Sequence, residues 1–251
     1  MRQRLLDHEW PLQGSHLRGD LSIRQLSWRL VLRLHHGKAM LEVKLEGWKT
    51  ADLPYTVHVF DVTEEMFDEI VDEGTKVELL DEVVIVHSPA SLEQENIRTF
   101  LGGLMRLYAE EKSLGLVIAS GNAITRLARS RKVAPDVFFI AKARVPKPLP
   151  KQFDGAPDLA VEILSASNRE DDLNRKRPAY RQAGVREIWF IDPESKQVIL
   201  DRRANDSYEE ETVSAGMVAS RVLEGFRIEV SWLWSDPVPN LLSCLGEILA
   251  Q

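Results

Sequence analysis

Two apolar segments, Val133-Ala-Pro-Asp-Val-Phe-Phe-Ile140 and Leu159-Ala-Val-Glu-Ile-Leu164, decide how this chain is expected to fold. Both read as buried strands, yet each carries one carboxylate, Asp136 in the first and Glu162 in the second. Because removing an unpaired carboxylate from water costs several kcal/mol, buried acids are almost always ion-paired or bound to a metal. Two such strands, separated by a proline-rich loop, can bring Asp136 and Glu162 face to face.

The surrounding sequence predicts strands and helices in mixed order. Thr63 is the expected N-cap of a first helix, and Ser91-Leu-Glu-Gln94 is a capping box that opens a second helix to about residue 112. A third helix is expected from 169 to 183, where Gly184 ends it. Further strands are expected at 55–60, 77–80, 83–87, 116–120, 124–128, 187–191 and 198–200, and an amphipathic stretch at 241–249. The order predicts an α/β or α+β fold with a mixed central sheet flanked by helices.

Composition and length indicate a globular protein with a sizeable core. The chain has 251 residues, of which 44% are hydrophobic and 28% charged. It contains no apolar run long enough to span a membrane. Cys244 is the only cysteine, so it can neither close an intrachain disulfide nor hold a zinc ion by itself, and a reducing cytoplasm is the expected location.

Residues 1–39 differ in composition from the rest of the chain. The segment Leu21–Leu34 is rich in arginine and mixes apolar and basic residues, with no acid among them. It could be a targeting segment, a basic arm for nucleic acid, or an extension upstream of a true start at Met40. We favour an extension, misassigned or disordered, because the composition changes near Met40. Residues 40–251 then form a single domain with a C-terminal tail.

Charge is strongly segregated along the chain, whose net charge is −7. Between residues 61 and 95, Lys76 is the only base among many acids. Between residues 126 and 151 the pattern reverses, and Asp136 is the only acid. The basic stretch can steer a polyanion toward Asp136, or it can simply be a solvated loop face.

The paired carboxylates support two interpretations. In the first, the two carboxylates and a backbone carbonyl form a hard-oxygen site suited to Mg²⁺ or Mn²⁺. In the second, they form salt bridges with nearby arginine and lysine side chains. Glu78 is a third acidic candidate. Lys176 lies four residues from Asp172, so it either forms a surface pair with Asp172 or supplies a cation that stabilises a transition state.

An ordered series of motifs resembles a known family. The series consists of Glu78-Leu-Leu-Asp-Glu-Val-Val, Ser88-Pro-Ala-Ser, Ala134-Pro-Asp-Val-Phe-Phe, Pro157-Asp-Leu-Ala-Val-Glu-Ile-Leu-Ser165, Asp172-Leu-Asn-Arg-Lys-Arg-Pro-Ala-Tyr180 and Gly184-Val-Arg-Glu-Ile-Trp-Phe-Ile-Asp-Pro193. The chain resembles the Uma-two family of restriction endonucleases, within the PD-(D/E)XK nuclease superfamily, over roughly residues 55–230.

The resemblance implies a restriction-endonuclease-like core and a metal-dependent endonuclease that hydrolyses DNA with water. Asp136, Glu162 and the Ile163 carbonyl would hold Mg²⁺ or Mn²⁺, and Glu78 would assist. Three positions depart from the family pattern: Leu164 stands where the superfamily has a lysine, Gln94 where many members have histidine, and Glu82 where many members have glycine. Lys176 would replace the missing lysine.

The resemblance also implies a homodimer that acts on DNA, because two strands are cut, and no contact with a membrane. A second function class stays open on the sequence. The missing lysine at position 164 and the acidic net charge are also compatible with a catalytically inactive nuclease fold that serves as a binding or assembly module, for example through self-association of the tail tryptophans. Asp158, four residues before Glu162, is expected to be at most an outer residue of the site.

Overall fold

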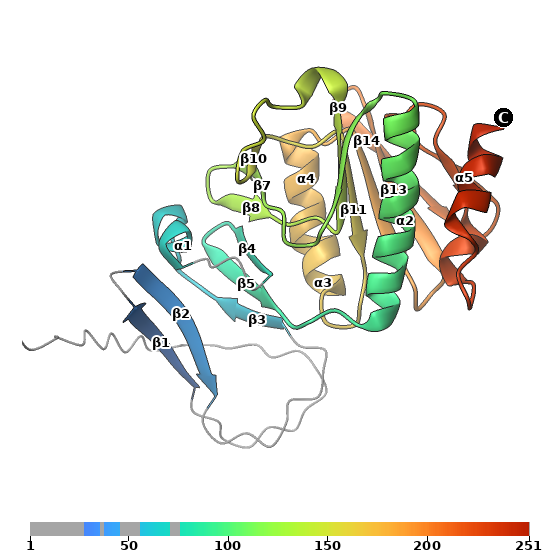
Figure 1. Cartoon of the computed structure of the whole chain (residues 1–251). Coiled ribbons are helices and arrows are strands. Elements are labelled where there is room, and N and C mark those ends of the chain that lie inside the picture. The colour runs from blue at the N-terminus through green and yellow to red at the C-terminus, as the bar shows by residue number, and fades with distance from the viewer. Residues whose placement is uncertain (1–27, 36–37, 46–55, 71–75, 251) are drawn as a thin grey trace, which may run out of the picture.

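A mixed six-stranded sheet forms the centre of the protein (Figure 1). The computed structural model describes residues 28–35, 38–45, 56–70 and 76–250. Within the central sheet β11 and β12 are parallel and the other neighbours are antiparallel, so the predicted mixed sheet is confirmed. In spatial order its strands are β14 (Ser207–Val213), β13 (Gln197–Ala204), β12 (Glu187–Asp192), β11 (Leu159–Ile163), β9 (Val137–Ala141) and β6 (Gly115–Ala119).

Helices cover both faces of the central sheet. In Figure 1, α2 (Leu92–Glu111) and α5 (Leu241–Leu249) lie on one side, and α4 (Arg177–Ala183) lies on the other. Strand β12 shows why both faces are apolar: Trp189 belongs to the core beneath α2, whereas the next residue, Phe190, belongs to the core beneath α4. A strand covered on both faces reads as one continuous apolar run.

The start of α2 is fixed by the predicted capping box. The Ser91 hydroxyl accepts a hydrogen bond from the Gln94 N–H at 3.2 Å, and the Gln94 side chain accepts one from the Ser91 N–H at 3.0 Å. The apolar positions of the helix, among them Leu101 and Leu104, are buried against the sheet. The cap also holds the Gln94 side chain at the end of the helix that faces the site described below.

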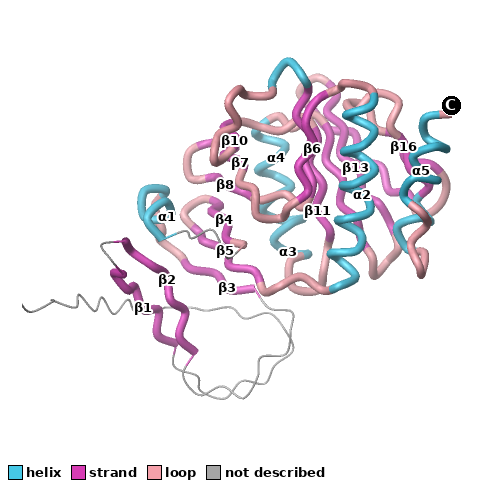
Figure 2. Tube along the Cα trace, viewed as in Figure 1, coloured by secondary structure: helices cyan, strands magenta, loops and turns pink. Residues whose placement is uncertain are grey.

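A second six-stranded sheet lies beside the central one, and Figure 2 shows it between α1 (Glu64–Ile70) and α3 (Arg169–Asp171). Its strands in spatial order are β10 (Phe153–Asp154), β7 (Thr125–Ala128), β8 (Arg131–Val133), β4 (Val77–Leu80), β5 (Val83–His87) and β3 (Thr56–Val59). Two smaller antiparallel pairs complete the strands: β1 (Trp28–His35) with β2 (Lys38–Leu45), and β15 (Met217–Ala219) with β16 (Arg227–Glu229).

The expected boundary at residue 40 lies inside the β1–β2 pair, in which Arg33 is the partner of Met40. Residues 1–27 lie outside the described part of the chain. The misassigned or disordered extension therefore stays a prediction.

The predicted single strand at 133–140 is wrong. Strand β8 ends at Val133 in the second sheet, and β9 begins at Val137 in the central sheet. Pro135 lies between them and has no N–H to donate to a strand ladder. Asp136 therefore lies in the short segment where the chain passes from one sheet to the other.

The predicted helix at 169–183 contains a wider turn than expected. Between α3 and α4, residues Asp172–Lys176 form a π-helical turn, in which the Arg177 N–H donates to the Asp172 carbonyl. Pro178 follows in the first turn of α4, where its missing N–H costs no hydrogen bond. The predicted stop at Gly184 is confirmed, because this glycine has the left-handed φ of 79°.

The C-terminal tail folds back onto the central core. A 3₁₀ turn at Val230–Trp234 and helix α5 pack beside α2, and Trp232 and Trp234 lie partly buried against the same apolar cluster as Trp189. None of the helices in the described part of the chain is long and apolar enough to cross a membrane.

Candidate active site

Strand register places Asp136 and Glu162 next to one another where β9 begins and β11 ends, in the interior of the central sheet. Val137 on β9 is the partner of Val161 on β11, so Asp136 stands opposite Glu162 one position further along. The Asp136 Oδ2 atom accepts a hydrogen bond from the Ile163 N–H at 2.7 Å. The side chain of Asp136 thus pairs with the backbone of β11 just before β9 begins. Both carboxylates are buried.

Glu162 belongs to a buried charge cluster that joins both sheets and a helix. Lys176 Nζ lies 2.7 Å from Glu162 Oε1, 2.9 Å from Glu78 Oε1 and 3.1 Å from Asp172 Oδ1. Glu78 comes from β4 of the second sheet, Glu162 from β11 of the central sheet, and the other two from the π-helical turn. All four side chains are completely buried. The prediction of a surface pair between Asp172 and Lys176 is therefore wrong.

Three further contacts complete the cluster. Tyr180 donates a hydrogen bond to Glu162 Oε1 at 2.5 Å, and His87 Nε2 lies 2.7 Å from Glu78 Oε2. The Ala134 N–H donates to Glu78 Oε1 at 2.7 Å. By contrast, the second oxygen of Glu162, Oε2, is buried without a hydrogen-bond partner among the described residues.

The pKa values of the buried acids diverge because their partners differ. Burial raises the pKa of Glu162 to about 8, and Lys176 offsets this only in part. Burial raises the pKa of Asp172 in the same way. Burial also opposes ionisation of Glu78, but Lys176 and His87 outweigh it and hold the pKa of Glu78 well below its ordinary value. Three carboxylates keep the pKa of Lys176 well above that of a free lysine, despite burial.

Asp136 has cationic partners of its own. Its Oδ1 lies 3.2 Å from Lys76 Nζ and 2.7 Å from Arg98 Nη2. Burial would raise the pKa of Asp136, but these two cations outweigh it and lower the pKa. Lys76 precedes β4 and Arg98 lies in the second turn of α2, so residues from three separate elements meet at this carboxylate.

The predicted ligand set suits a hard divalent ion in its chemistry. Asp136, Glu162 and the Ile163 carbonyl offer oxygen atoms alone, and the partnerless Oε2 of buried Glu162 is an acceptor that a cation would satisfy. The Ile163 carbonyl now accepts hydrogen bonds from the side-chain amides of Gln94, at 3.4 Å, and Asn168, at 3.2 Å. No group of three or more His, Cys, Asp or Glu side chains in the described ranges is arranged to hold a metal ion. A site here would consist of two carboxylates and a backbone carbonyl.

A polar cavity of about 620 Å³ opens at this point of the fold. Among the residues that line it are Lys76, Arg98 and Asp136, with Gln94 and Asn168 beside them. Glu78, Glu162 and Lys176 lie behind this wall rather than on it. The cavity thus gives solvent access to Asp136 but not to Lys176.

Asp158 and the basic stretch at 126–151 contribute little to the surroundings of Asp136. Asp158 lies apart from the cluster: its Oδ2 accepts a hydrogen bond from the Ala141 N–H at 2.8 Å, and its Oδ1 lies 3.0 Å from Arg144 Nη1. The basic stretch at 126–151 is not one continuous cationic rim, because several of its bases pair with the acidic stretch. Arg126 pairs with Glu64 and Arg131 with Asp81.

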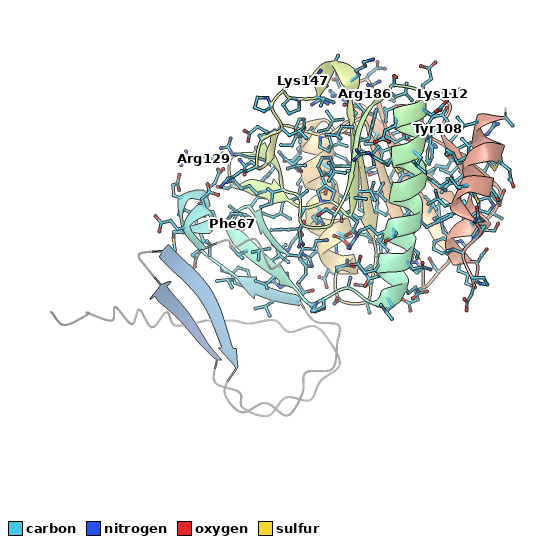
Figure 3. The ribbon with its side chains drawn as sticks, viewed as in Figure 1. Phe67, Tyr108, Lys112, Arg129, Lys147 and Arg186 are labelled. Atoms are coloured by element: carbon cyan, nitrogen blue, oxygen red, sulfur yellow. The ribbon has the colours of Figure 1, made fainter. Side chains whose placement is uncertain are left out.

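Figure 3 shows two bases of this stretch well apart, with Arg129 beside α1 and Lys147 near the loop that follows β9. Arg129 Nη2 lies 3.7 Å from Glu65 Oε1, both of them exposed. The bases that approach Asp136 are instead Lys76 and Arg98, which belong to other parts of the chain.

Sequence reasoning missed Lys76, Arg98, His87 and Tyr180 as members of this centre. One signal was present for Lys76, which is the single base in the acidic stretch at 61–95 and lies two residues before Glu78. Tyr180 lies four residues after Lys176, which places both on one helical face. Arg98 had no distinguishing signal, because an arginine four residues after Gln94 is also an ordinary solvated helix residue.

Comparison with known proteins identifies the family. A family model named Uma2, with the description "Putative restriction endonuclease", matches residues 64–231. The chain belongs to the Uma2 family. The predicted resemblance is thereby confirmed, and the match includes Glu78, Asp136, Glu162 and Lys176.

A solved structure supports the fold of this Uma2 protein. It is described as "a putative nuclease belonging to DUF820" from Anabaena variabilis, and it superimposes with a TM-score of 0.62 over 69% of this chain and 97% of that chain. Sequence identity is 16%, so the likeness concerns the fold alone. A search of curated proteins finds no match.

Proposed function

We propose that this chain is a metal-dependent endonuclease that hydrolyses phosphodiester bonds in DNA. The observation that carries the proposal is the pairing of two buried carboxylates, Asp136 and Glu162, at the ends of β9 and β11 beside a solvent-accessible cavity. Membership in a family described as restriction endonucleases supports the same reaction class. Buried acids that are this strongly perturbed, next to a cavity, are typical of catalytic centres.

We assign the metal-binding roles to Asp136, Glu162 and the Ile163 carbonyl, with Mg²⁺ or Mn²⁺ as the ion. When bound, such an ion would supply Lewis acidity toward a phosphate oxygen and toward water. Glu78 assists by sharing Lys176 with Glu162, and Lys176 balances the negative charge of the cluster. Because Glu162 has a raised pKa, a cation at its free oxygen would favour the ionised form.

Plasmid cleavage by the full chain tests this proposal. We expect nicking or linearisation of supercoiled DNA in Mg²⁺ or Mn²⁺, none in EDTA, and loss in Asp136→Asn and in Glu162→Gln. Glu187→Gln is the matched control, because Glu187 is also a completely buried glutamate, but it lies at the other end of the neighbouring strand β12.

Two results would contradict the proposal. One is wild-type activity that survives both Asp136→Asn and Glu162→Gln, and the other is a folded wild-type chain that cuts no DNA with either metal. In the second case, retained DNA binding would favour the alternative of an inactive binding module. We also propose a symmetric dimer for cutting both strands, which a molar-mass measurement by light scattering in the presence of DNA tests directly.

A further inference from the structure

The two lysines of the centre differ in what they can reach. Lys176 is completely buried, and its ammonium is surrounded by three carboxylates. Because this ammonium is shut off from solvent, a substrate in the cavity cannot reach it. Lys76 lines the cavity, its side chain is 16% exposed, and among the described residues it forms an ion pair with Asp136 alone, at 3.2 Å. Lys76 therefore has both solvent access and spare donors.

Arg98 is held beside Lys76 by a close backbone approach. Its Nη1 contacts Glu95 Oε1 at 2.5 Å and its Nη2 contacts Asp136 Oδ1 at 2.7 Å. On the other side lies Gly121, where an added Cβ would be 2.9 Å from the guanidinium carbon. Gly121 also has a φ of 68°, in the left-handed region that glycine tolerates best. The guanidinium of Arg98 thus packs against the backbone of Gly121, where a larger residue would displace it.

These two cations meet at one oxygen of Asp136 on the cavity wall. A phosphate oxygen is an acceptor for the same N–H groups, and a guanidinium can bind phosphate through two of them. The remaining lining is rich in small polar side chains, including Ser120, Asn122 and Ser167. Such a lining suits an anionic, hydrogen-bonding ligand rather than an apolar one.

We propose that Lys76 and Arg98 are the residues that contact the phosphate of the substrate, and that Lys176 is a positioning residue which never touches it. This inference rests on the proposed function and assigns the roles within that site. Lys76, rather than Lys176, then has the role of the catalytic lysine. Its pairing with Asp136 keeps its charge at the cavity wall before the substrate arrives.

DNA binding without turnover tests these roles separately from the reaction. Fluorescence anisotropy of the full chain with a short labelled DNA duplex in EDTA measures affinity when no cleavage occurs. We expect Lys76→Gln and Arg98→Gln each to weaken binding about 10-fold or more, as for loss of a hydrogen bond between charged groups. Each should also lower the slope of log K against log[salt] by about 1. Lys76→Arg should restore most of the affinity.

The matched control is Arg129→Gln, because Arg129 is exposed and does not line the cavity, yet lies in the basic stretch. Circular dichroism melting confirms that each variant is folded. Unchanged affinity and salt slope in Lys76→Gln would overturn the proposal, as would an equal loss in Arg129→Gln. A chain that binds DNA through Lys76 but never cleaves it would refute the proposed nuclease function, while the assignment of phosphate contacts to Lys76 and Arg98 would stand.

Discussion

Replacement of Lys176 by methionine should destabilise the fold severely. The substitution keeps the length of the side chain but removes a charge that lies within 3.1 Å of Glu78, Glu162 and Asp172, all completely buried. Removing one partner of a buried ion pair costs about 3–5 kcal/mol, because the remaining charge has no partner. For a protein of this size that corresponds to a fall in melting temperature of about 6–20 °C. Differential scanning calorimetry at neutral pH measures the change.

The loss of stability in Lys176→Met should depend on pH and on Glu78. At low pH the carboxylates take up protons, so the deficit of Lys176→Met should shrink. A second substitution, Glu78→Gln, should recover part of the lost stability, because Glu78, whose pKa lies well below its ordinary value, is the carboxylate that keeps its charge when Lys176 is lost. Lys142→Met serves as the control, since Lys142 is exposed and should shift the melting temperature little. A melting temperature within about 2 °C of wild type for Lys176→Met would refute the reasoning, given that range.

Three further substitutions test individual contacts. The pKa of Glu162 is raised from 4.5 to about 8, so between these pH values the folded state keeps a proton that the unfolded state releases. The melting temperature of the wild type should therefore fall relative to that of Glu162→Gln as the pH rises from 4.5 to about 8. Equal changes of both melting temperatures with pH would contradict this. Gly121→Ala should reduce DNA affinity as Arg98→Gln does, since the new Cβ displaces the guanidinium; full affinity in a binding assay would exclude that contact. Tyr180→Phe should cost about 1.5–3 kcal/mol in urea unfolding, because it removes a buried hydrogen bond to a carboxylate, whereas no change would show that the bond contributes nothing.

Local signals in the sequence were sufficient for the elements they govern. The capping box at Ser91 and the glycine at 184 act over a few residues, so the ends that they define were predicted correctly. The apolar run at 133–140 was misread, because hydrophobicity does not reveal to which sheet a strand belongs. Pro135 was the one local sign of a break.

Strand β14 escaped prediction for a different reason. Its sequence, Ser-Tyr-Glu-Glu-Glu-Thr-Val, contains three glutamates and is mostly exposed, because it forms the edge of the central sheet next to β13. Pairing with a neighbour, rather than burial of alternate side chains, holds such a strand in place, and a charged edge also discourages pairing with other molecules. No periodic pattern marks it in the sequence.

Members of the candidate site were predictable from the sequence where a charged residue lies within an apolar segment. Asp136 and Glu162 stood out because they interrupt apolar strands, and the structure places them at opposed positions. Arg98 and His87 did not stand out, because their importance depends on long-range packing of α2 and β5 against the central sheet. The role of Lys76 likewise depends on its distance from Asp136, and that distance is a property of the tertiary structure.

The charge cluster is divided between two sheets, with Glu78 on β4, Glu162 on β11 and Lys176 connecting them from the π-helical turn. Neither sheet contains a complete centre, so the centre exists only while both are docked. A ligand that binds there gains contacts that are absent whenever the sheets separate, and its binding free energy adds directly to the cost of local opening. Substrate occupancy should therefore protect the amides of β4 and β5 from hydrogen exchange, even though these strands lie mostly outside the cavity.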